Sequence, residues 1–482
     1  MINSKWNKGL ILVCIVLLLI TTVFPCSSRD IDSELNVISK QTKTTYDLLI
    51  IAPEEFIPSL RSLVDHKNLF GVKTVIIDVD EIYEEFTGRD QAEQVKYFIK
   101  HVVEEWNVQY VLLVGGRKGQ SRVEEWWIPV RYCHIEFLPP DGRFENRFIS
   151  DLYFADIYTK NGNFSSWDTD NDSIFSEWPQ NASAEDIIDL APDVAVGRLP
   201  CRNVYEVKTT VQKIIDYEQE KCDDSWFKNI VVISFKTDRV MPGWNGENIQ
   251  RLGLTYMQDF NQIKLWASNG TLRSSRDVIK AFNQGCGFIW FFGGANPKLW
   301  GVYLSNESIL WRFIFRNSEI PLLVNNKKLP ICLDGSGCHN CQFNVSIGNT
   351  LDFRPFHGKN WVSTITAECM GERLLTHPYG GCIAVIGPTA MGHDSIGIVS
   401  RRGGCDWLEI HFLEDYNIKK INVLGDVWRN SLCQYVQNFT IDWTDTTSKD
   451  DSIIVKAAET WSLFGDPSLQ IGGYPERYND LK

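Results

Sequence analysis

The chain has 482 residues, 44% of them hydrophobic and 23% charged, with a formal net charge of -13. This composition is typical of a globular protein, and the length predicts about two or three domains. The negative charge, together with the lack of any basic cluster in the sequence, argues against a nucleic-acid partner.

The first 28 residues have the layout of an export signal. Lys5 and Lys8 precede an apolar stretch, residues 9–23, after which polarity returns. That stretch is short for a bilayer span, which needs about 20 apolar residues. We therefore expect residues 1–28 to be a signal peptide or an N-terminal membrane anchor, and residues 29–45 to be a polar tether. The protein would then be secreted, or attached to a membrane only through this segment.

Strand-like and helix-like segments alternate after the tether. Short apolar runs at 46–52, 72–79 and 110–114 have the pattern of buried strands, while residues 91–106 carry apolar side chains at helical spacing on one face. This alternation predicts a parallel sheet covered by helices on both faces.

The stretch 168–177 carries acidic residues at alternating positions. Carboxylate oxygens in such a loop are the ligands that calcium prefers. The stretch lacks the central glycine of an EF-hand loop, and a solvated acidic loop is the competing interpretation. We predict a structural calcium ion bound by Asp168, Asp170, Asp172, Glu177 and the main-chain carbonyl of Ile174.

A charged segment at 220–224 precedes a second alternation of strands and helices. Its strand-like runs lie at 229–234, 262–266, 287–292 and 382–386. Two α/β units in tandem, residues 46–220 and 221–475, each with its own core, are the economical interpretation. Residues 476–482 would form a short tail.

The stretch 329–343 bears most directly on chemistry. Its buried-strand pattern ends at a glycine turn, so Cys338 lies at the carboxyl end of a strand, where ligands bind in open α/β sheets. A thiol on such a turn can act as a nucleophile, with main-chain N–H groups as oxyanion donors. The competing interpretations are a buried small hydrophobe, a disulfide, or half of a zinc site with Cys341, for which the sequence has no second Cys-x-x-Cys pair.

Five motifs, in this order along the chain, resemble the gingipain family of cysteine endopeptidases. They are Ser150–Tyr153, Val196–Leu199, Ala281–Gly285, Gly337–Phe343 and Leu463–Leu469. The likeness covers residues 46–473 and implies two tandem caspase-like α/β subdomains, with mostly parallel sheets flanked by helices. It also implies an exported cysteine endopeptidase that acts on polypeptides.

The resemblance places the family's catalytic apparatus on particular residues of this chain. The nucleophile falls on Cys338, the acid that orients the family's histidine on Asp238, and an oxyanion N–H on Ala295. Gly294 stands where the histidine should be. Glycine can neither draw the thiol to thiolate nor protonate the leaving amine, so general acid–base catalysis worth about 10²–10⁴-fold is missing from this position.

Because of Gly294, the function stays open between three hypotheses. The chain is an active peptidase, or a pseudopeptidase that keeps its cleft as a peptide-binding module, or a thiol–disulfide protein that uses Cys338 and Cys341. The third is the weakest, since such pairs usually open a helix in a far smaller fold. Among possible replacement imidazoles, His339 is expected to diverge from its neighbour Cys338, and His393, in a glycine-bounded loop after a strand, is the best remaining candidate.

Overall fold

The computed structural model describes residues 45–136, 145–234, 245–303, 311–335, 337–348, 365–394, 403–446 and 450–475. All of them belong to one compact unit, Thr44–Lys482. The expected leader at 1–28 and tail at 476–482 lie outside the described residues. Within the described ranges, no helix is long and apolar enough to cross a membrane.

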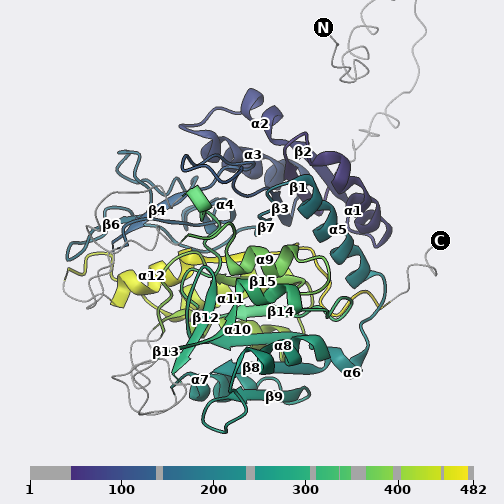
Figure 1. Cartoon of the computed structure of the whole chain (residues 1–482). Coiled ribbons are helices and arrows are strands. Elements are labelled where there is room, and N and C mark those ends of the chain that lie inside the picture. Colours follow the sequence, from purple (N-terminus) through teal and green to yellow (C-terminus); the bar gives the residue numbers. More distant parts are fainter. Residues whose placement is uncertain are drawn as a thin grey trace, which may run out of the picture. The chain divides into compact units, whose positions relative to one another are not determined.

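One ten-stranded sheet organises this unit (Figure 1). Four of its strands come from residues 48–199: β1 (Leu48–Ala52), β2 (Thr74–Asp78), β3 (Tyr110–Val114) and β7 (Ala195–Leu199). Six come from residues 229–464: β8 (Asn229–Ser234), β9 (Asn261–Trp266), β10 (Phe288–Phe292), β14 (Ile331–Asp334), β15 (Ala384–Pro388) and β16 (Trp461–Phe464). The strand order is β2-β1-β3-β7-β16-β15-β14-β10-β8-β9. Each of these two segments therefore supplies a contiguous part of the sheet, and the subdomain boundary near 220–221 stays a prediction.

Neighbouring strands run parallel except for β15 and β16, which are antiparallel. This single reversal turns the two halves of the sheet in opposite directions. The carboxyl ends of β8, β10, β14 and β15 consequently meet at one edge, and those of β1, β3 and β7 meet at the opposite edge. The mostly parallel, helix-covered sheet that the sequence predicted is confirmed.

Helices pack on both faces of the sheet (Figure 1). The longer ones are α1 (Ile57–Leu69), α3 (Gln91–Trp106), α5 (Val204–Glu218), α7 (Asn245–Leu254), α8 (Ser275–Gln284), α10 (Cys405–Asn417), α11 (Leu424–Asn438) and α12 (Asp450–Thr460). Shorter ones are α2 (Val79–Glu85), α4 (Leu152–Ala155), α6 (Asp224–Phe227), α9 (Met370–Thr376) and the 3-10 helix η1 (Asn317–Leu322). Helix α3 shows why the pattern predicted it: the Asp90 side chain caps its first turn, apolar residues bury one face, and Asn107 ends it in the left-handed conformation at φ 58°.

Two small three-stranded sheets flank the main one. The first contains β4 (Tyr132–Ile135), β5 (Phe148–Ile149) and β6 (Glu177–Trp178). The second contains β11 (Gly294–Asn296), β12 (Leu299–Tyr303) and β13 (Trp311–Arg316), and it directly follows β10. The second sheet therefore continues the chain from the edge at which β10 and β14 end.

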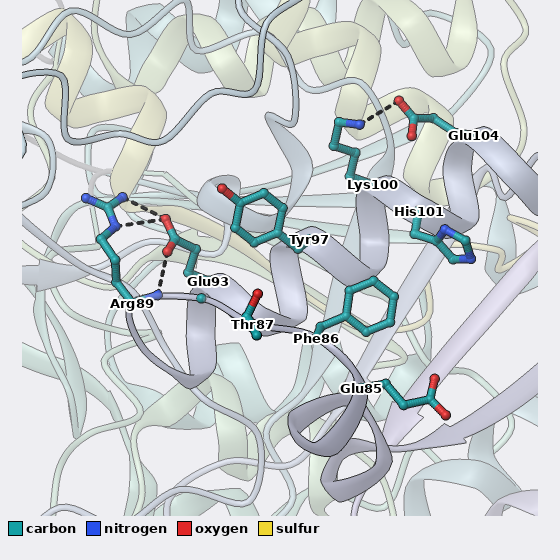
Figure 2. Close-up of a pocket in the computed structure, with 10 residues that line it drawn as sticks. Glu85, Phe86, Thr87, Arg89, Glu93, Tyr97, Lys100, His101 and Glu104 are labelled. Carbon is teal, nitrogen blue, oxygen red and sulfur yellow. Dashed lines mark hydrogen bonds and ion pairs between the residues drawn. The ribbon is translucent and has the colours of Figure 1, made fainter.

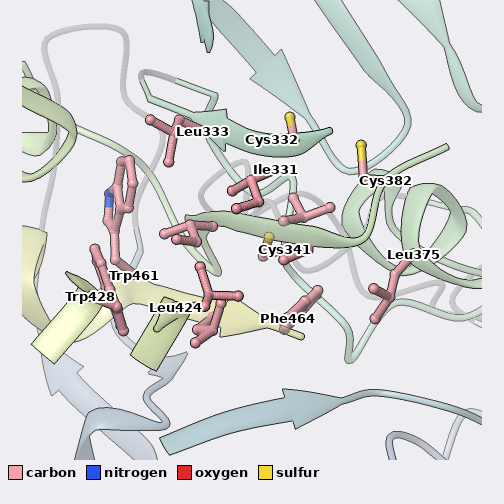
Figure 3. Packing of buried hydrophobic residues seen from close by; sticks show 14 of the residues in the cluster. Ile331, Cys332, Leu333, Cys341, Leu375, Cys382, Leu424, Trp428, Trp461 and Phe464 are labelled. Atoms are coloured by element: carbon pink, nitrogen blue, oxygen red, sulfur yellow. The ribbon is translucent and has the colours of Figure 1, made fainter. Parts of the chain in front are cut away.

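The core is packed tightly beneath that edge. Figure 3 shows buried side chains of β14, β16 and α11, including Leu333, Phe464 and Leu424, and the ring of Trp428 in α11 stacks on Trp461 with centroids 5.9 Å apart. Every residue of β14 is buried. A strand buried on both faces holds the turn that follows it in a fixed place, which matters for the residues described next.

Candidate active site

Cys338 lies just beyond the carboxyl end of β14, which ends at Asp334. Only glycine fits at position 337, because a Cβ there would lie 1.8 Å from Asp334 Oδ1. Cys338 is half-buried, and none of the cysteines in the described part of the chain is in a disulfide. Its Sγ lies 3.7 Å from the main-chain oxygen of Gly392. The thiol is thus neither oxidised nor deep in the apolar core, the two states that would have excluded a nucleophile.

His339 points away from Cys338 into the interior. Its backbone is left-handed at φ 63°, its main-chain N–H donates to Ala390 O at 2.7 Å, and its Nε2 lies 3.5 Å from Glu145 Oε1. Lys456 Nζ pairs with the same carboxylate at 2.5 Å. Burial alone would raise the pKa of Glu145, but the charges of Lys456 and His339 outweigh it and lower the pKa below its ordinary value. Glu145 is therefore ionised beneath the nucleophile turn.

His393 follows the carbonyl that contacts the Cys338 sulfur. Its own main-chain oxygen accepts from Cys405 N at 2.7 Å, at the first residue of α10. Burial, and then the positive charge of Lys456, lower the pKa of the His393 imidazole to about 3, although Glu145 acts in the opposite direction. The imidazole is consequently neutral in the resting protein.

Asn340 connects the nucleophile turn to the strand that contains Gly294. Its Nδ2 donates to Asn296 O at 2.6 Å, and Trp300 Nε1 donates to its Oδ1 at 2.6 Å. These bonds hold β11, which begins at Gly294 and contains Ala295, against the Cys338 turn. Gly294 has the extended backbone of a strand, a conformation that any residue can adopt.

Two carboxyl groups that the sequence did not single out lie under the turn. Asp334 and Glu409 are both fully buried, and burial raises the pKa of each well above its ordinary value. Trp300 Nε1 donates to Asp334 Oδ2 at 3.1 Å, and a Cβ at Gly335 would lie 2.1 Å from Glu409 Oε2. Burial thus favours the neutral form of both acids beneath the nucleophile turn. Glu409 comes from helix α10, and nothing in its local sequence indicates this position.

The structure describes some of the predicted site residues and leaves one outside the described ranges. Cys338, Gly294 and Ala295 are brought to one edge of the sheet through Asn340. Asp238 lies in 235–244, outside the described residues, so its orienting role stays a prediction. Sequence reasoning missed Glu145, because it reaches His339 of the nucleophile turn from a distant part of the chain.

The acidic loop forms a different ligand set from the one expected. Carboxylate oxygens of Asp168, Asp170 and Asp186 all lie within 4.8 Å of one another. Asp186 was not among the predicted ligands, and Asp172 and Glu177 are not in this group. The structure therefore gathers two of the five predicted ligands and adds a third from farther along the chain.

Hydrogen bonds and burial explain that difference. The Asp172 carboxylate accepts from the main-chain N–H of Ile174 at 2.7 Å, so it turns back on its own loop. Glu177 opens β6, where burial and then the negative charges of Glu185 and Asp172 raise its pKa to about 7. Asp168 also pairs with Arg89, which already offsets part of the negative charge.

A cavity of about 690 Å³ lies between the α2–α3 connection and α3, and Figure 2 shows its lining. Arg89 and Glu93 lie at one end, where the guanidinium donates to the Glu93 carboxylate at 2.7 Å, and His101 lies at the other. None of the predicted site residues lines this cavity. The nucleophile turn is therefore a separate feature of the molecule.

Comparison with known proteins gives the fold and the turn a family context. The sequence model of peptidase family C25 matches residues 41–472. Gingipain R2 of Porphyromonas gingivalis strain W83 is 22% identical over 438 residues, which is 88% of this chain and 46% of the relative. Gingipain R1 of Porphyromonas gingivalis is also 22% identical, over 88% of this chain and 34% of the relative. The chain thus spans less than half the length of these curated relatives.

Solved structures of gingipains share the fold. The Arg-specific cysteine proteinase gingipain R (RgpB) superposes with a TM-score of 0.58 at 20% identity, over 90% of this chain and 79% of that one. The complex of the RgpB pro- and mature domains from Porphyromonas gingivalis gives 0.57 at 20% identity, over 88% and 79%. The gingipain-type fold expected from the sequence motifs is confirmed. With a match of the family model over nearly the whole described region, the chain belongs to peptidase family C25, the gingipain-type cysteine peptidases.

Proposed function

We propose that the chain is an exported cysteine endopeptidase that hydrolyses peptide bonds through Cys338. The setting of the thiol carries this proposal: it is half-exposed, it follows a fully buried strand, and main-chain hydrogen bonds hold its turn. Membership of a cysteine peptidase family makes polypeptides the substrate class. Export rests on residues 1–28, which have the composition of a signal peptide or a membrane anchor.

The reaction begins when Cys338 Sγ attacks the carbonyl carbon of the scissile peptide and forms an oxyanion. The main-chain N–H groups of Cys338 and Ala295 are the proposed donors to that oxygen, with Asp238 as the residue that would orient an imidazole at this site. The proton lost by the Cys338 thiol passes through water to the leaving amine as the C–N bond breaks, and water then hydrolyses the thioester and returns a proton to the sulfur. Gly294 has no side chain to supply that proton.

A pseudopeptidase that binds peptides without cleaving them is the rival proposal, and Gly294 favours it. Loss of general acid–base catalysis would slow hydrolysis by about 10²–10⁴-fold. The thiol–disulfide hypothesis has less support, because Cys341 is fully buried and burial raises the pKa of its thiol well above the ordinary value. Thiol exchange requires an accessible thiolate.

Hydrolysis of a denatured protein substrate by the purified chain without residues 1–28 separates these proposals. We expect cleavage that is lost in Cys338→Ala and kept in Cys433→Ala, a matched control at another half-buried cysteine. Peptide binding without cleavage, equal in the wild type and Cys338→Ala, would favour the pseudopeptidase. Cleavage that survives in Cys338→Ala would contradict a Cys338 nucleophile.

A structural calcium ion at Asp168, Asp170 and Asp186 is a further part of the proposal. Three carboxylate oxygens within 4.8 Å of one another fit the hard oxygen ligands that calcium prefers. These residues would hold the ion and so tie together the two ends of the acidic loop. The ion has no part in the proposed chemistry at Cys338.

A further inference from the structure

We propose that Asn340 is a positioning residue for the reaction at Cys338, because its side chain fixes strand β11 beside the nucleophile. This inference rests on the proposed function of Cys338. The Asn340 amide connects the two parts of the chain that supply the proposed oxyanion donors. One donor is the main-chain N–H of Cys338, and the other is that of Ala295, the middle residue of β11.

The main chain of Asn340 is fixed two residues beyond the nucleophile. Its carbonyl accepts from Gly371 N, in α9, at 2.9 Å. The next residue, Cys341, donates its main-chain N–H to Pro388 O, at the end of β15, at 3.0 Å. The Asn340 side chain therefore leaves a backbone that is held by a helix and by the main sheet, so its position relative to Cys338 is set.

The side chain of Asn340 is fully buried and has a partner for each end of its amide. Its Nδ2 donates to the main-chain oxygen of Asn296, the last residue of β11, at 2.6 Å. Its Oδ1 accepts from Trp300 Nε1 at 2.6 Å. A flipped amide would set oxygen against oxygen and N–H against N–H, so these partners permit one orientation only. We call the amide and its two partners the Asn340 clamp.

Trp300 gives the clamp a second connection to β11. Its backbone in β12 lies directly opposite Ala295 in the antiparallel pair of β11 and β12. Its indole is fully buried and stacks on Phe291 of β10, with ring centroids 4.4 Å apart. The indole N–H is shared between Asn340 and Asp334 Oδ2, which lies 3.1 Å away at the end of β14. Two strands of the main sheet thus hold the ring that orients the amide.

Burial keeps Asn340 away from the substrate, so it acts by holding β11 in place. The oxyanion donors stabilise the charge that develops on the carbonyl oxygen, and a displacement of about 1 Å at such a site can cost about 10²-fold in rate. Interactions that are made only in the transition state affect kcat rather than KM. Loss of the clamp should therefore slow the chemical step and leave substrate binding nearly unchanged.

Removal of the amide tests this role. We expect Asn340→Ala to lower kcat for peptide hydrolysis by about 10²-fold with little change in KM. The matched control is Asn325→Ala: Asn325 is also buried, and its Nδ2 donates to the main-chain oxygen of Gly381, just before β15 begins, at 2.9 Å. This control should keep the wild-type kinetics. Thermal melts establish that each variant folds.

Trp300→Phe serves as a second variant if Asn340→Ala does not fold. It removes the Nε1 donor but keeps an aromatic ring to stack on Phe291, so kcat should fall by a smaller factor than in Asn340→Ala. Because the indole acts through the amide, the double variant should be slower than Asn340→Ala by no more than about twofold. Effects of the two substitutions that multiply in full would show that they do not act as one clamp.

Binding of a peptide aldehyde gives a readout that needs no turnover. The probe is the tightest member of a panel of tripeptide aldehydes with apolar, acidic and basic terminal residues. The Cys338 thiol adds across the aldehyde C=O bond: the S–C bond forms, the thiol proton passes to the oxygen, and that oxygen takes the position of the oxyanion. Asn340→Ala should bind the aldehyde more weakly by a factor similar to its loss in kcat. Alkylation of Cys338 by iodoacetamide forms no oxyanion, so its rate should be unchanged.

The outcomes separate this inference from the proposed function. A wild type that binds the aldehyde through Cys338 but cleaves no peptide would defeat the proposed function alone, and the aldehyde affinities would still decide the role of Asn340. A wild type that neither cleaves nor binds the aldehyde would overturn both. Equal kcat and aldehyde affinity in the wild type and Asn340→Ala would overturn the positioning role. So would a loss of kcat that Asn325→Ala shares, because a general loss of structure would then explain it.

Discussion

Gly294 stands where the family resemblance places a histidine, on the strand that lies against the nucleophile turn. Gly294 opens β11 in an extended conformation, so a histidine there meets no backbone penalty. Asn340 already holds β11 against the nucleophile turn through its bond to Asn296 O. A new side chain at 294 would therefore be held close to the nucleophile turn.

A histidine at position 294 should supply an acid–base group to Cys338. We expect Gly294→His to raise peptide turnover by about 10²–10⁴-fold, and Cys338→Ala to abolish the gain. The kcat values of the wild type, Gly294→His and Gly294→His with Cys338→Ala measure this directly. A wild type that already hydrolyses peptides at ordinary enzyme rates would contradict the premise, because another residue must then act as the base.

At the scale of the element, the acidic loop is the segment whose structure depends on charge. Asp168 accepts main-chain N–H groups from Asp172 at 3.1 Å and Ser173 at 3.0 Å, so the loop folds around this carboxylate. Glu177 starts the next strand with its pKa raised to about 7, first by burial and then by neighbouring acids. Crowded carboxylates of this kind favour either a proton or a cation.

Calcium should stabilise the folded protein by mass action on this loop. We expect the melting temperature to rise in millimolar calcium and to fall on addition of chelator, and we expect Asp186→Asn to abolish the difference. Glu177 lies outside the three ligands, but the negative charge that it gains as pH increases through about 7 favours a nearby cation, so the shift should grow over that range. Asp65→Asn, an exposed acid on α1, is the control. A melt insensitive to calcium at pH 8 would remove the proposed ion.

At the scale of the whole molecule, the two halves of the sheet are joined where β7 pairs with β16. Arg198 of β7 is fully buried there and donates to the Asp151 carboxylate at 2.7 and 2.8 Å and to Gly115 O at 2.9 Å. Each partner of this ion pair belongs to a motif that resembled the gingipains: Asp151 lies in Ser150–Tyr153 and Arg198 in Val196–Leu199. Their recurrence in the family pattern thus has a structural cause at the junction.

Breaking the Arg198 ion pair should destabilise both halves together. Arg198→Met leaves the buried Asp151 carboxylate unpaired, which costs about 3–5 kcal/mol of unfolding free energy. Because one sheet runs through the unit, urea unfolding followed by tryptophan fluorescence and by circular dichroism should give coincident single transitions in both proteins. Two separate transitions would show that residues 46–220 and 221–475 fold as independent domains.

The amino-acid sequence by itself determined the local elements and the family. Residues 91–106 form α3 as the periodicity predicted, because one apolar face has to be buried, and the run at 331–333 forms β14 because every side chain in it is apolar. The glycine turn before Cys338 could also be predicted from the sequence, and the structure shows that position 337 leaves no room for a Cβ. A helix, a buried strand and a glycine turn depend mainly on residues that are close together in the sequence.

Only the tertiary structure decided which distant residues meet beneath the nucleophile turn. Strand β16 enters the sheet between β7 and β15 and reverses the direction of the second half, a placement that no local pattern specifies. There Glu145, His339 and Lys456, which are far apart in the sequence, form one set of charged contacts. These residues come together because the apolar faces of the helices and strands that contain them are buried against one another, and the packing of the whole core determines which faces meet.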